Sequence, residues 1–260
     1  MVKGSWRELE FEIARWRDAG RGVDFWWRDD DATQPCAPLA RLLSLAREAR
    51  VPIALAVVPA GAEPALGELL HEGVDLLQHG HDHVNRAAPG EKKSEFPSYE
   101  APASALARLA SGRERLGRLF GARALEVLAP PWNRVPAALA GDLARAGLHG
   151  LSCYGPRAAC GPRLATTPEL VQVNTHVDIV DWRDARRFVG EERALGLALG
   201  HLTAQREGRA EQEPTGWLTH HAVHDDAAWQ FLGRAIDFVR RVDGIRWRSA
   251  RELFTPRAKE

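Results

Sequence analysis

The stretch VDFWWRDDDA, residues 23–32, joins an apolar run to a cluster of charges. Residues 23–27 are mostly apolar and aromatic, which is typical of a short buried strand. The run ends in Arg28 and three consecutive aspartates, whose carboxylates repel one another. Adjacent anions at the end of a buried strand are costly unless a cation or a metal ion neutralises them. The stretch therefore predicts a strand that delivers acidic side chains to a functional site.

Short apolar runs and helical patterns alternate along the rest of the chain. This alternation predicts parallel strands joined by helical crossovers, and the number of runs favours a barrel over an open sheet. We expect an α/β fold, a single-domain (β/α) barrel of seven to eight strands over residues 1–260. Further strands are expected at 53–58, 74–78, 124–129, 150–153, 170–173, 216–220 and 244–247, and helices at 5–19, 39–47, 65–71, 103–120, 135–146, 184–206 and 225–242.

Composition excludes several classes of protein. Lys and Arg together number 35, as do Asp and Glu, so no basic field favours nucleic acid or an anionic membrane. No stretch is apolar enough to span a membrane, and the N-terminus lacks the apolar core of a signal peptide. The three cysteines (Cys36, Cys153 and Cys160) are odd in number and form no C-x-x-C. They fit a reducing compartment, so we expect a cytoplasmic protein, with its oligomeric state left open.

Unusual residues gather where the expected strands end. The motifs HGHDH (79–83), PPWNR (130–134), NTHVDIVDW (174–182) and HHAVHD (220–225) each follow an apolar run. Active sites of barrel enzymes lie at the carboxyl ends of the strands. Seven of the 10 histidines lie in these segments: His79, His81, His83, His176, His220, His221 and His224. Such clustering indicates a common site.

The aspartates and HGHDH together have the composition of a metal site. One Asp with His79 and His83 supplies three ligands and leaves a position open for water, as in catalytic zinc sites. A second Asp beside the ligand is placed to accept the proton of that water. In the alternative interpretation HGHDH is a polar surface loop, and Arg28 merely neutralises the acidic run. We expect one divalent metal ion, zinc, as the cofactor.

The order of these motifs resembles that of the polysaccharide deacetylase superfamily, metal-dependent carbohydrate esterases with a distorted (β/α) barrel. The counterparts here are RDDDA (28–32), HGHDH (79–83), APPWN (129–133), DIVDW (178–182) and LTH (218–220). The resemblance spans nearly the whole chain and implies Asp30 as general base and His220 as general acid. It implies Asp31, His79 and His83 as metal ligands. A register shifted by one would instead make Asp29 the base and Asp30 the ligand.

The sequence departs from the superfamily pattern in two further places. Gly80 stands where the superfamily has Ser or Thr, and Ala129 stands where it has an Arg that orients the base. Arg28 or Arg134 could supply that charge. On a regular strand His220 and His221 point to opposite faces, so only one faces the barrel mouth.

Three other loop residues have two interpretations each. Trp132 and Trp182 follow site residues closely, and their aromatic faces suit sugar rings, although buried packing explains them equally well. Asp178 could bond a site histidine or cap the following helix. We list Arg28, Asp29, Trp132, Arg134, Asp178, Trp182 and His221 as candidates for substrate contact or for support of the site.

These features predict a metal-dependent hydrolase that acts on C–N bonds other than peptide bonds. By resemblance it removes an acetyl group from an N-acetylated sugar or glycan precursor, and without a secretion signal we expect an intracellular substrate. One alternative is a hydrolase of a non-sugar amide on the same scaffold. Another is an inactive carbohydrate-binding relative, which Ala129 favours, whereas the retention of Asp30 and His220 favours an enzyme.

Overall fold

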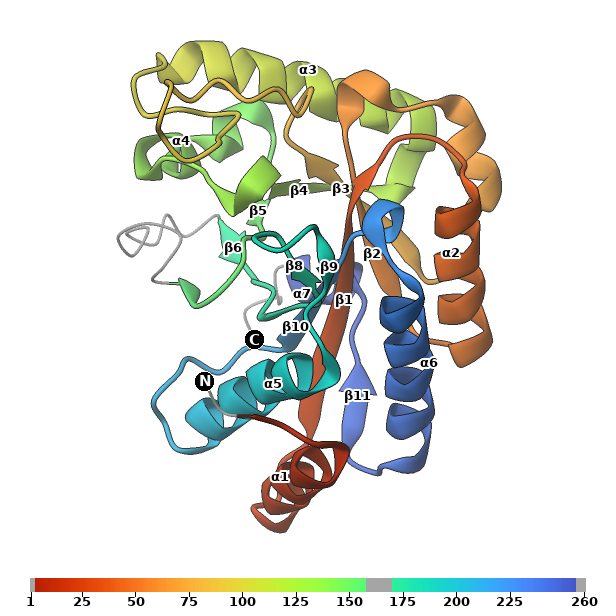
Figure 1. Ribbon diagram of the computed structural model, residues 1–260. Helices are drawn as coiled ribbons and strands as arrows, with labels where there is room; N and C mark the ends of the chain where they lie inside the picture. The colour runs from red at the N-terminus through yellow and green to blue at the C-terminus, as the bar shows by residue number, and fades with distance from the viewer. Residues whose placement is uncertain (1–2, 158–169, 256–260) are drawn as a thin grey trace.

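A curled parallel sheet forms the centre of the molecule (Figure 1). The computed structural model describes residues 3–157 and 170–255, which leaves Cys160 outside the described part. The strand order is β6-β5-β4-β3-β2-β1-β10-β7, with β11 also paired to β1. The strands are β1 (Val23–Ala32), β2 (Ile53–Val57), β3 (Val74–His79), β4 (Ala124–Ala129), β5 (Gly150–Leu151), β6 (Val171–Gln172), β7 (Val177–Asp178), β10 (Thr215–Thr219) and β11 (Ile245–Trp247).

The two ends of the sheet approach each other through the segment between β6 and β7. Thr175 donates its backbone N–H to Cys153, which follows β5, at 2.9 Å. The next residue, His176, donates to Gly216 of β10 at 2.7 Å. Residues 175 and 176 therefore hydrogen-bond to both ends of the sheet, one to the segment after β5 and the other to β10. The result is a distorted (β/α) barrel with all its strand pairs parallel, as the alternation of elements predicts.

Helices cover the outside of the curled sheet (Figure 1). The α-helices are α1 (Trp6–Asp18), α2 (Ala37–Ala49), α3 (Pro102–Phe120), α4 (Ala137–Gly141), α5 (Glu191–Arg206), α6 (Asp226–Arg241) and α7 (Ala250–Phe254). Short 3-10 turns are η1 (Pro59–Gly61), η2 (Pro64–Leu69), η3 (Gly121–Arg123), η4 (Pro131–Asn133), η5 (Leu143–Ala146) and η7 (His221–Val223), and β8 (Val180–Asp181) pairs antiparallel with β9 (Arg187–Phe188).

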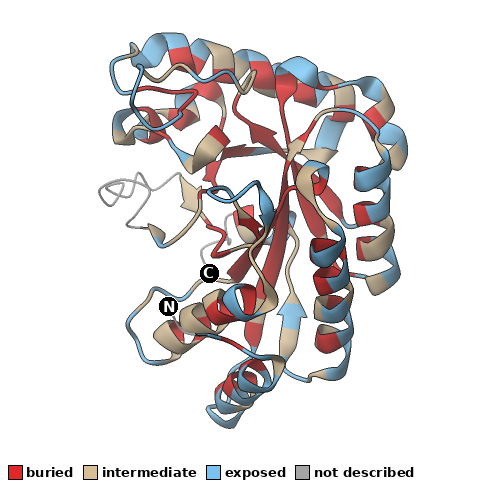
Figure 2. Cartoon of the chain, viewed as in Figure 1, coloured by how far each residue is buried: buried red, intermediate tan, exposed pale blue. Residues whose placement is uncertain are grey.

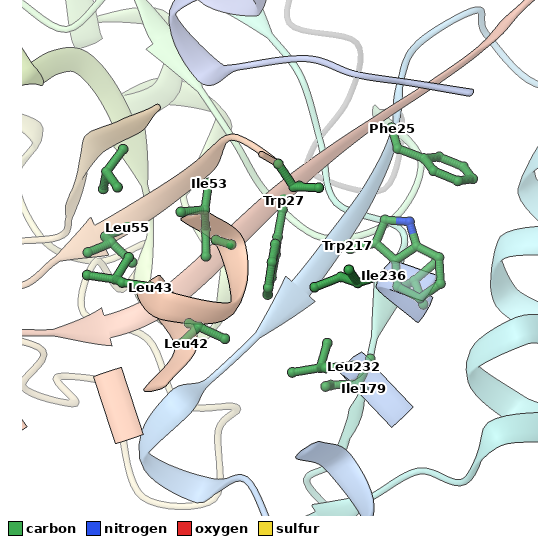
Figure 3. Close-up of a cluster of buried hydrophobic side chains, with 14 of the residues drawn as sticks. Phe25, Trp27, Leu42, Leu43, Ile53, Leu55, Ile179, Trp217, Leu232 and Ile236 are labelled. Atoms are coloured by element: carbon green, nitrogen blue, oxygen red, sulfur yellow. The ribbon is translucent and has the colours of Figure 1, made fainter. Parts of the chain in front are cut away.

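The main core lies between the sheet and its outer helices. Figure 2 shows the central strands buried and the outward helix faces exposed. In Figure 3, Phe25 and Trp27 of β1 lie among side chains from α2 and α6, such as Leu42 and Leu232. Alternate residues such as Trp26 belong to a second cluster on the other face of the strands. Burying each large apolar side chain contributes about 1.5–3 kcal/mol, so both faces of β1 hold this strand in place.

Four expectations differ in detail from the structure. The helix expected at 65–71 is the 3-10 turn η2, which ends at Leu69, and 135–146 divides into α4 and η5. Residues 184–190 contain the end of the β8–β9 hairpin, and α5 begins only at Glu191, after Gly190 with φ +86°. Strand β1 is longer than its apolar run, because it continues through the aspartates to Ala32. No helix in the described ranges has the length and apolar character needed to span a membrane.

Candidate active site

A distortion at the end of β1 directs the three aspartates in different directions. The pairing of β1 with β2 shifts register between Asp29 and Ala32, and Asp31 adopts a left-handed backbone with φ +71°. A bulge of this kind re-aims side chains that a regular strand would point to alternate faces. Asp29 and Asp30 are buried, whereas Asp31 is half-buried. Each carboxylate consequently has its own set of partners.

Asp31 lies with two histidines of the HGHDH motif. Its Oδ1 atom is 3.1 Å from Nε2 of His79 and 3.2 Å from Nε2 of His83. His79 is the last residue of β3, and His83 has a left-handed backbone with φ +57° that turns its ring back toward the strand end. The three residues form a group whose ligand atoms are all within 4.8 Å of one another. Sequence reasoning named the same three residues.

The hydrogen bonding of His79 fits metal binding. Its Nδ1 atom lies 2.8 Å from the carbonyl oxygen of Ala129, so the neutral ring donates from Nδ1 and carries a lone pair on Nε2. That lone pair points at a carboxylate oxygen, an arrangement that needs a cation or a proton between the two atoms. A tetrahedral zinc ion with bonds of about 2.1 Å places its ligand atoms about 3.4 Å apart. The spacing of Asp31, His79 and His83 therefore fits a divalent metal ion.

The charges of this group are strongly coupled. Burial alone would raise the pKa of the Asp31 carboxyl, but hydrogen bonds from His79 and His83 outweigh it and hold that pKa far below its usual range. Burial would likewise lower the pKa of His79, yet the charges of Asp30 and Asp31 raise it overall. The group as a whole therefore favours a positive charge, from protons or from a metal ion, at the position between the carboxylates and the imidazoles.

Asp30 belongs to a different network, whose centre is the buried guanidinium of Arg28. Arg28 Nε lies 2.8 Å from Asp30 Oδ1, and Nη2 donates to Oδ2 at 3.0 Å. The remaining donors of Arg28 reach the carbonyl and hydroxyl oxygens of Ser152 at 2.7 and 2.8 Å and Asn133 Oδ1 at 2.7 Å. This fork fixes the Asp30 carboxylate beside Asp31. Arg28 thus contacts the candidate base, whereas Arg134 donates to the carbonyl of Lys93 instead.

The Asp29 side chain links β1 to the end of β10 through hydrogen bonds. Its Oδ2 accepts hydrogen bonds from Thr219 Oγ1 at 2.7 Å and from the His221 backbone at 3.0 Å, and its Oδ1 lies 2.5 Å from His221 Nδ1. Burial would raise the pKa of Asp29, but the charge and hydrogen bond of His221 lower it overall. Burial would lower the pKa of His221, and the charge of Asp29 raises it. The pair is a buried ion pair that occupies both side chains.

His220 faces the other aspartates. Its Nε2 atom lies 3.8 Å from Asp30 Oδ2, and its ring meets the edge of Trp182 with centroids 4.6 Å apart. Trp182 donates its indole N–H to Asp178 at 2.8 Å. Burial raises the pKa of Asp178, although the nearby charge of His220 opposes that rise. The adjacent histidines therefore have different partners, although both follow the end of β10, at the start of the turn η7, and do not lie on a regular strand.

Two tryptophans flank the site. Trp132 packs on His83 with ring centroids 4.4 Å apart, and Trp182 is 46% exposed. Trp132 and its neighbour Asn133 both have a left-handed backbone, with φ +54° and +55°. Such a conformation is uncommon outside glycine and is frequent at functional sites. The loop after β4 thereby presents an indole beside one histidine and the amide of Asn133 to Arg28.

A second group of possible ligands contains His176, His201 and Glu213. Gly216 donates its backbone N–H to His176 Nδ1 at 3.1 Å, so the neutral ring keeps its proton on Nε2, 3.2 Å from Glu213 Oε1. That proton occupies the position that a metal would need. Arg157 also donates to the same carboxylate, at 3.1 Å. This second group is satisfied by its own hydrogen bonds, and we assign no metal to it.

Solved structures of other proteins share the fold of this chain. Solved structures with the same fold include a family 4 carbohydrate esterase from Streptomyces lividans in complex with acetate, 15% identical with TM-score 0.53, covering 86% of this chain and 90% of that one. A family 4 acetyl xylan esterase from Clostridium thermocellum in complex with a cobalt ion is 13% identical with TM-score 0.52, covering 89% and 90%. The chain has the polysaccharide deacetylase fold.

A further structure with this fold is the peptidoglycan deacetylase PdaC from Bacillus subtilis. It is 14% identical with TM-score 0.53, and the match covers 90% of each chain. A scan of protein-family models finds no match, and a search of curated proteins finds none either. The polysaccharide deacetylase fold is therefore recognised through its three-dimensional structure, as the order of motifs predicts.

The structure adds residues that sequence reasoning did not single out. Ser152 and Asn133 hold Arg28, and Thr219 holds Asp29. Asn133 was visible only as part of the PPWNR motif, and its role depends on a partner 105 residues away. Ser152 gives no signal in the sequence, because nothing local marks a small polar residue at a strand end as the partner of a buried arginine.

Proposed function

We propose that this protein is a metal-dependent hydrolase that removes the acetyl group from an N-acetylated sugar. The observation that carries the proposal is the convergence of Asp31, His79 and His83 beside Asp30 and His220. These five side chains come from the ends of three parallel strands, where barrel enzymes build active sites. The fold shared with carbohydrate esterases and deacetylases supports the same conclusion.

Asp31, His79 and His83 would hold the metal ion. A divalent ion held there would lower the pKa of a water molecule and polarise an acyl oxygen. We place zinc there because one carboxylate and two imidazoles leaving an open position are typical of catalytic zinc sites. The Ala129 carbonyl fixes the ring of His79 for this purpose, because its hydrogen bond leaves Nε2 free to ligate.

Asp30 would act as the general base. Its carboxylate is fixed by Arg28, which donates from Nη2 to Oδ2 and places Nε 2.8 Å from Oδ1, and it lies next in sequence to the ligand Asp31. Asp30 accepts a proton from the attacking water while the water oxygen forms a bond to the acyl carbon. Arg28 in this way supplies the charge that the superfamily draws from the position of Ala129. The geometry thus favours the pair Asp30 and Asp31 over Asp29 and Asp30.

His220 would act as the general acid. Its ring makes a T-shaped contact with Trp182, and its Nε2 atom lies 3.8 Å from Asp30 Oδ2. When the C–N bond breaks, His220 donates a proton to the departing nitrogen, and acetate and a free amine are the products. His221 is committed to Asp29 and is not available for this step. Trp182 and Trp132 offer aromatic faces against which a sugar ring can stack.

A substrate panel tests the proposal. Zinc-loaded protein is incubated with N-acetylglucosamine oligomers, N-acetylated sugar nucleotides and N-acetylated amines that lack a sugar, and released acetate is measured. We expect acetate from at least one N-acetylated sugar, loss of release on chelation, and none from Asp30→Asn. Release only from non-sugar amides would move the substrate outside carbohydrates. Glycan binding without release by the metal-loaded protein would instead identify an inactive binding protein.

A further inference from the structure

Glu95 is a buried carboxylate in the long loop between β3 and α3. Glu95 is 0% exposed, although its neighbours in sequence are mostly polar. It follows His83, the last residue of the HGHDH motif, by 12 residues. In the part of the chain that the structure describes, all hydrogen bonds to this carboxylate come from backbone N–H groups. A buried anion without a compensating partner is costly, so these contacts need an explanation.

The donors are three consecutive N–H groups of the HGHDH loop. Glu95 Oε1 accepts from His81 at 2.8 Å and from Asp82 at 3.4 Å, and Oε2 accepts from His83 at 3.0 Å. Successive backbone N–H groups in a tight turn form a concave site for an anion. The loop that carries both histidine ligands is thus wrapped around the carboxylate of Glu95.

Gly80 makes this arrangement possible. It has a left-handed backbone with φ +60°, and a Cβ atom at this position would lie 2.2 Å from Glu95 Oε2. Any side chain at position 80 would collide with the carboxylate. A Cβ atom there would also lie 2.7 Å from the ring of Pro131, so Glu95 and Pro131 together give a physical reason for glycine where the superfamily has Ser or Thr.

Glu95 is itself held firmly on both sides. Ser94 accepts a hydrogen bond from the Arg86 backbone at 2.8 Å, and its hydroxyl accepts one from the Phe96 backbone at 3.1 Å. The ring of Phe96 is buried in the cluster that includes Leu109 and Leu128. A carboxylate with fixed neighbours can hold the left-handed turn at His83, a conformation that otherwise costs about 1–3 kcal/mol.

We infer that Glu95 is a positioning residue that holds the His79–His83 loop in the geometry required to bind metal. The inference rests on the proposed metal site. It predicts that loss of the Glu95 carboxylate weakens metal affinity even though Glu95 is not a ligand. Residues that orient metal ligands typically contribute about 10- to 100-fold to affinity, and a factor in that range is expected here.

The test compares zinc affinity, measured by competition with a chromophoric chelator, in wild type, Glu95→Gln and Glu91→Gln. Glutamine has the same shape but turns an N–H₂ group toward a backbone donor, so Glu95→Gln should bind zinc at least about tenfold more weakly. Glu91 is exposed in the same loop, and its variant should match wild type. Equal affinity in Glu95→Gln and wild type would overturn the inference.

Amide hydrogen exchange in the metal-free protein supplies a second readout. The His81 and His83 amide protons should be protected in wild type and should exchange faster in Glu95→Gln, while amides of β2 are unchanged. Glu95→Asp keeps the charge at shorter reach, and its zinc affinity should fall between those of the other two proteins. Failure of wild type to bind zinc would defeat the proposed function, whereas unchanged exchange at His81 and His83 would defeat the role of Glu95 alone.

Discussion

The Arg28→Met substitution tests the buried network that fixes the candidate base. Arg28 is 0% exposed and its guanidinium contacts Asp30, Ser152 and Asn133. Methionine fills much of the same volume but leaves the Asp30 carboxylate buried without its ion-pair partner. Removal of one partner from a buried pair costs about 3–5 kcal/mol. We therefore expect the free energy of unfolding to fall by about that amount.

Equilibrium denaturation in urea measures the change, provided that the slope of the transition stays constant. The double variant Arg28→Met/Asp30→Asn removes the unpaired charge as well, so it should recover part of the loss and give a clearly non-additive cycle. As a control, Arg234→Met breaks an exposed ion pair with Glu191 and should cost at most about 1 kcal/mol. A cost below about 1 kcal/mol for Arg28→Met, or strict additivity in the cycle, would refute the reasoning.

Three further predictions concern single side chains. Asp30→Asn should keep the metal and lose turnover, whereas Asp31→Asn should lose both; metal loss from Asp30→Asn would mean that the register is shifted by one. His220→Ala should lower kcat by roughly 100-fold with metal content and melting midpoint nearly unchanged, because only proton donation is lost; His221→Ala should do much less to kcat, and the opposite pattern would exchange their roles. Burial and the charge of a neighbouring histidine lower the pKa of His201 from 6.5 to about 3, so below pH 6.5 the unfolded chain binds a proton that the folded chain does not. As pH falls toward 3, the free energy of unfolding of wild type should therefore decrease relative to that of His201→Gln by up to about 1.4 kcal/mol per pH unit. Parallel curves of stability against pH for the two proteins would contradict this.

The barrel and the grouping of two HGHDH histidines with an aspartate could be predicted because their signals are local. Apolar runs alternate with helical patterns, and the residues of HGHDH are neighbours in sequence whose spacing suits one metal ion. The rule that parallel strands end at one edge of a sheet placed one of the three aspartates beside His79, and the superfamily resemblance selected Asp31 among them. The superfamily resemblance then assigned roles, which remain proposals for this chain.

The supporting contacts could not be predicted, because they join residues distant in sequence. Whether Arg28 or Arg134 meets the base depends on how the loop after β4 folds, and its left-handed turn at Trp132 has no marker in the sequence. Glu95 lies in a stretch that reads as a solvated charged loop, yet its side chain is enclosed by the turn of His81 and His83. Burial that arises from loop geometry leaves no periodic pattern.

The central claim is that Asp31, His79 and His83 form one metal site. Metal content of the purified proteins after zinc loading and desalting tests it most directly, with His81→Ala as the matched control from the same motif. We predict one equivalent of zinc in wild type and in His81→Ala, and loss of that equivalent in His79→Ala, His83→Ala and Asp31→Asn. Zinc retained at the wild-type level in His79→Ala and His83→Ala would contradict the account.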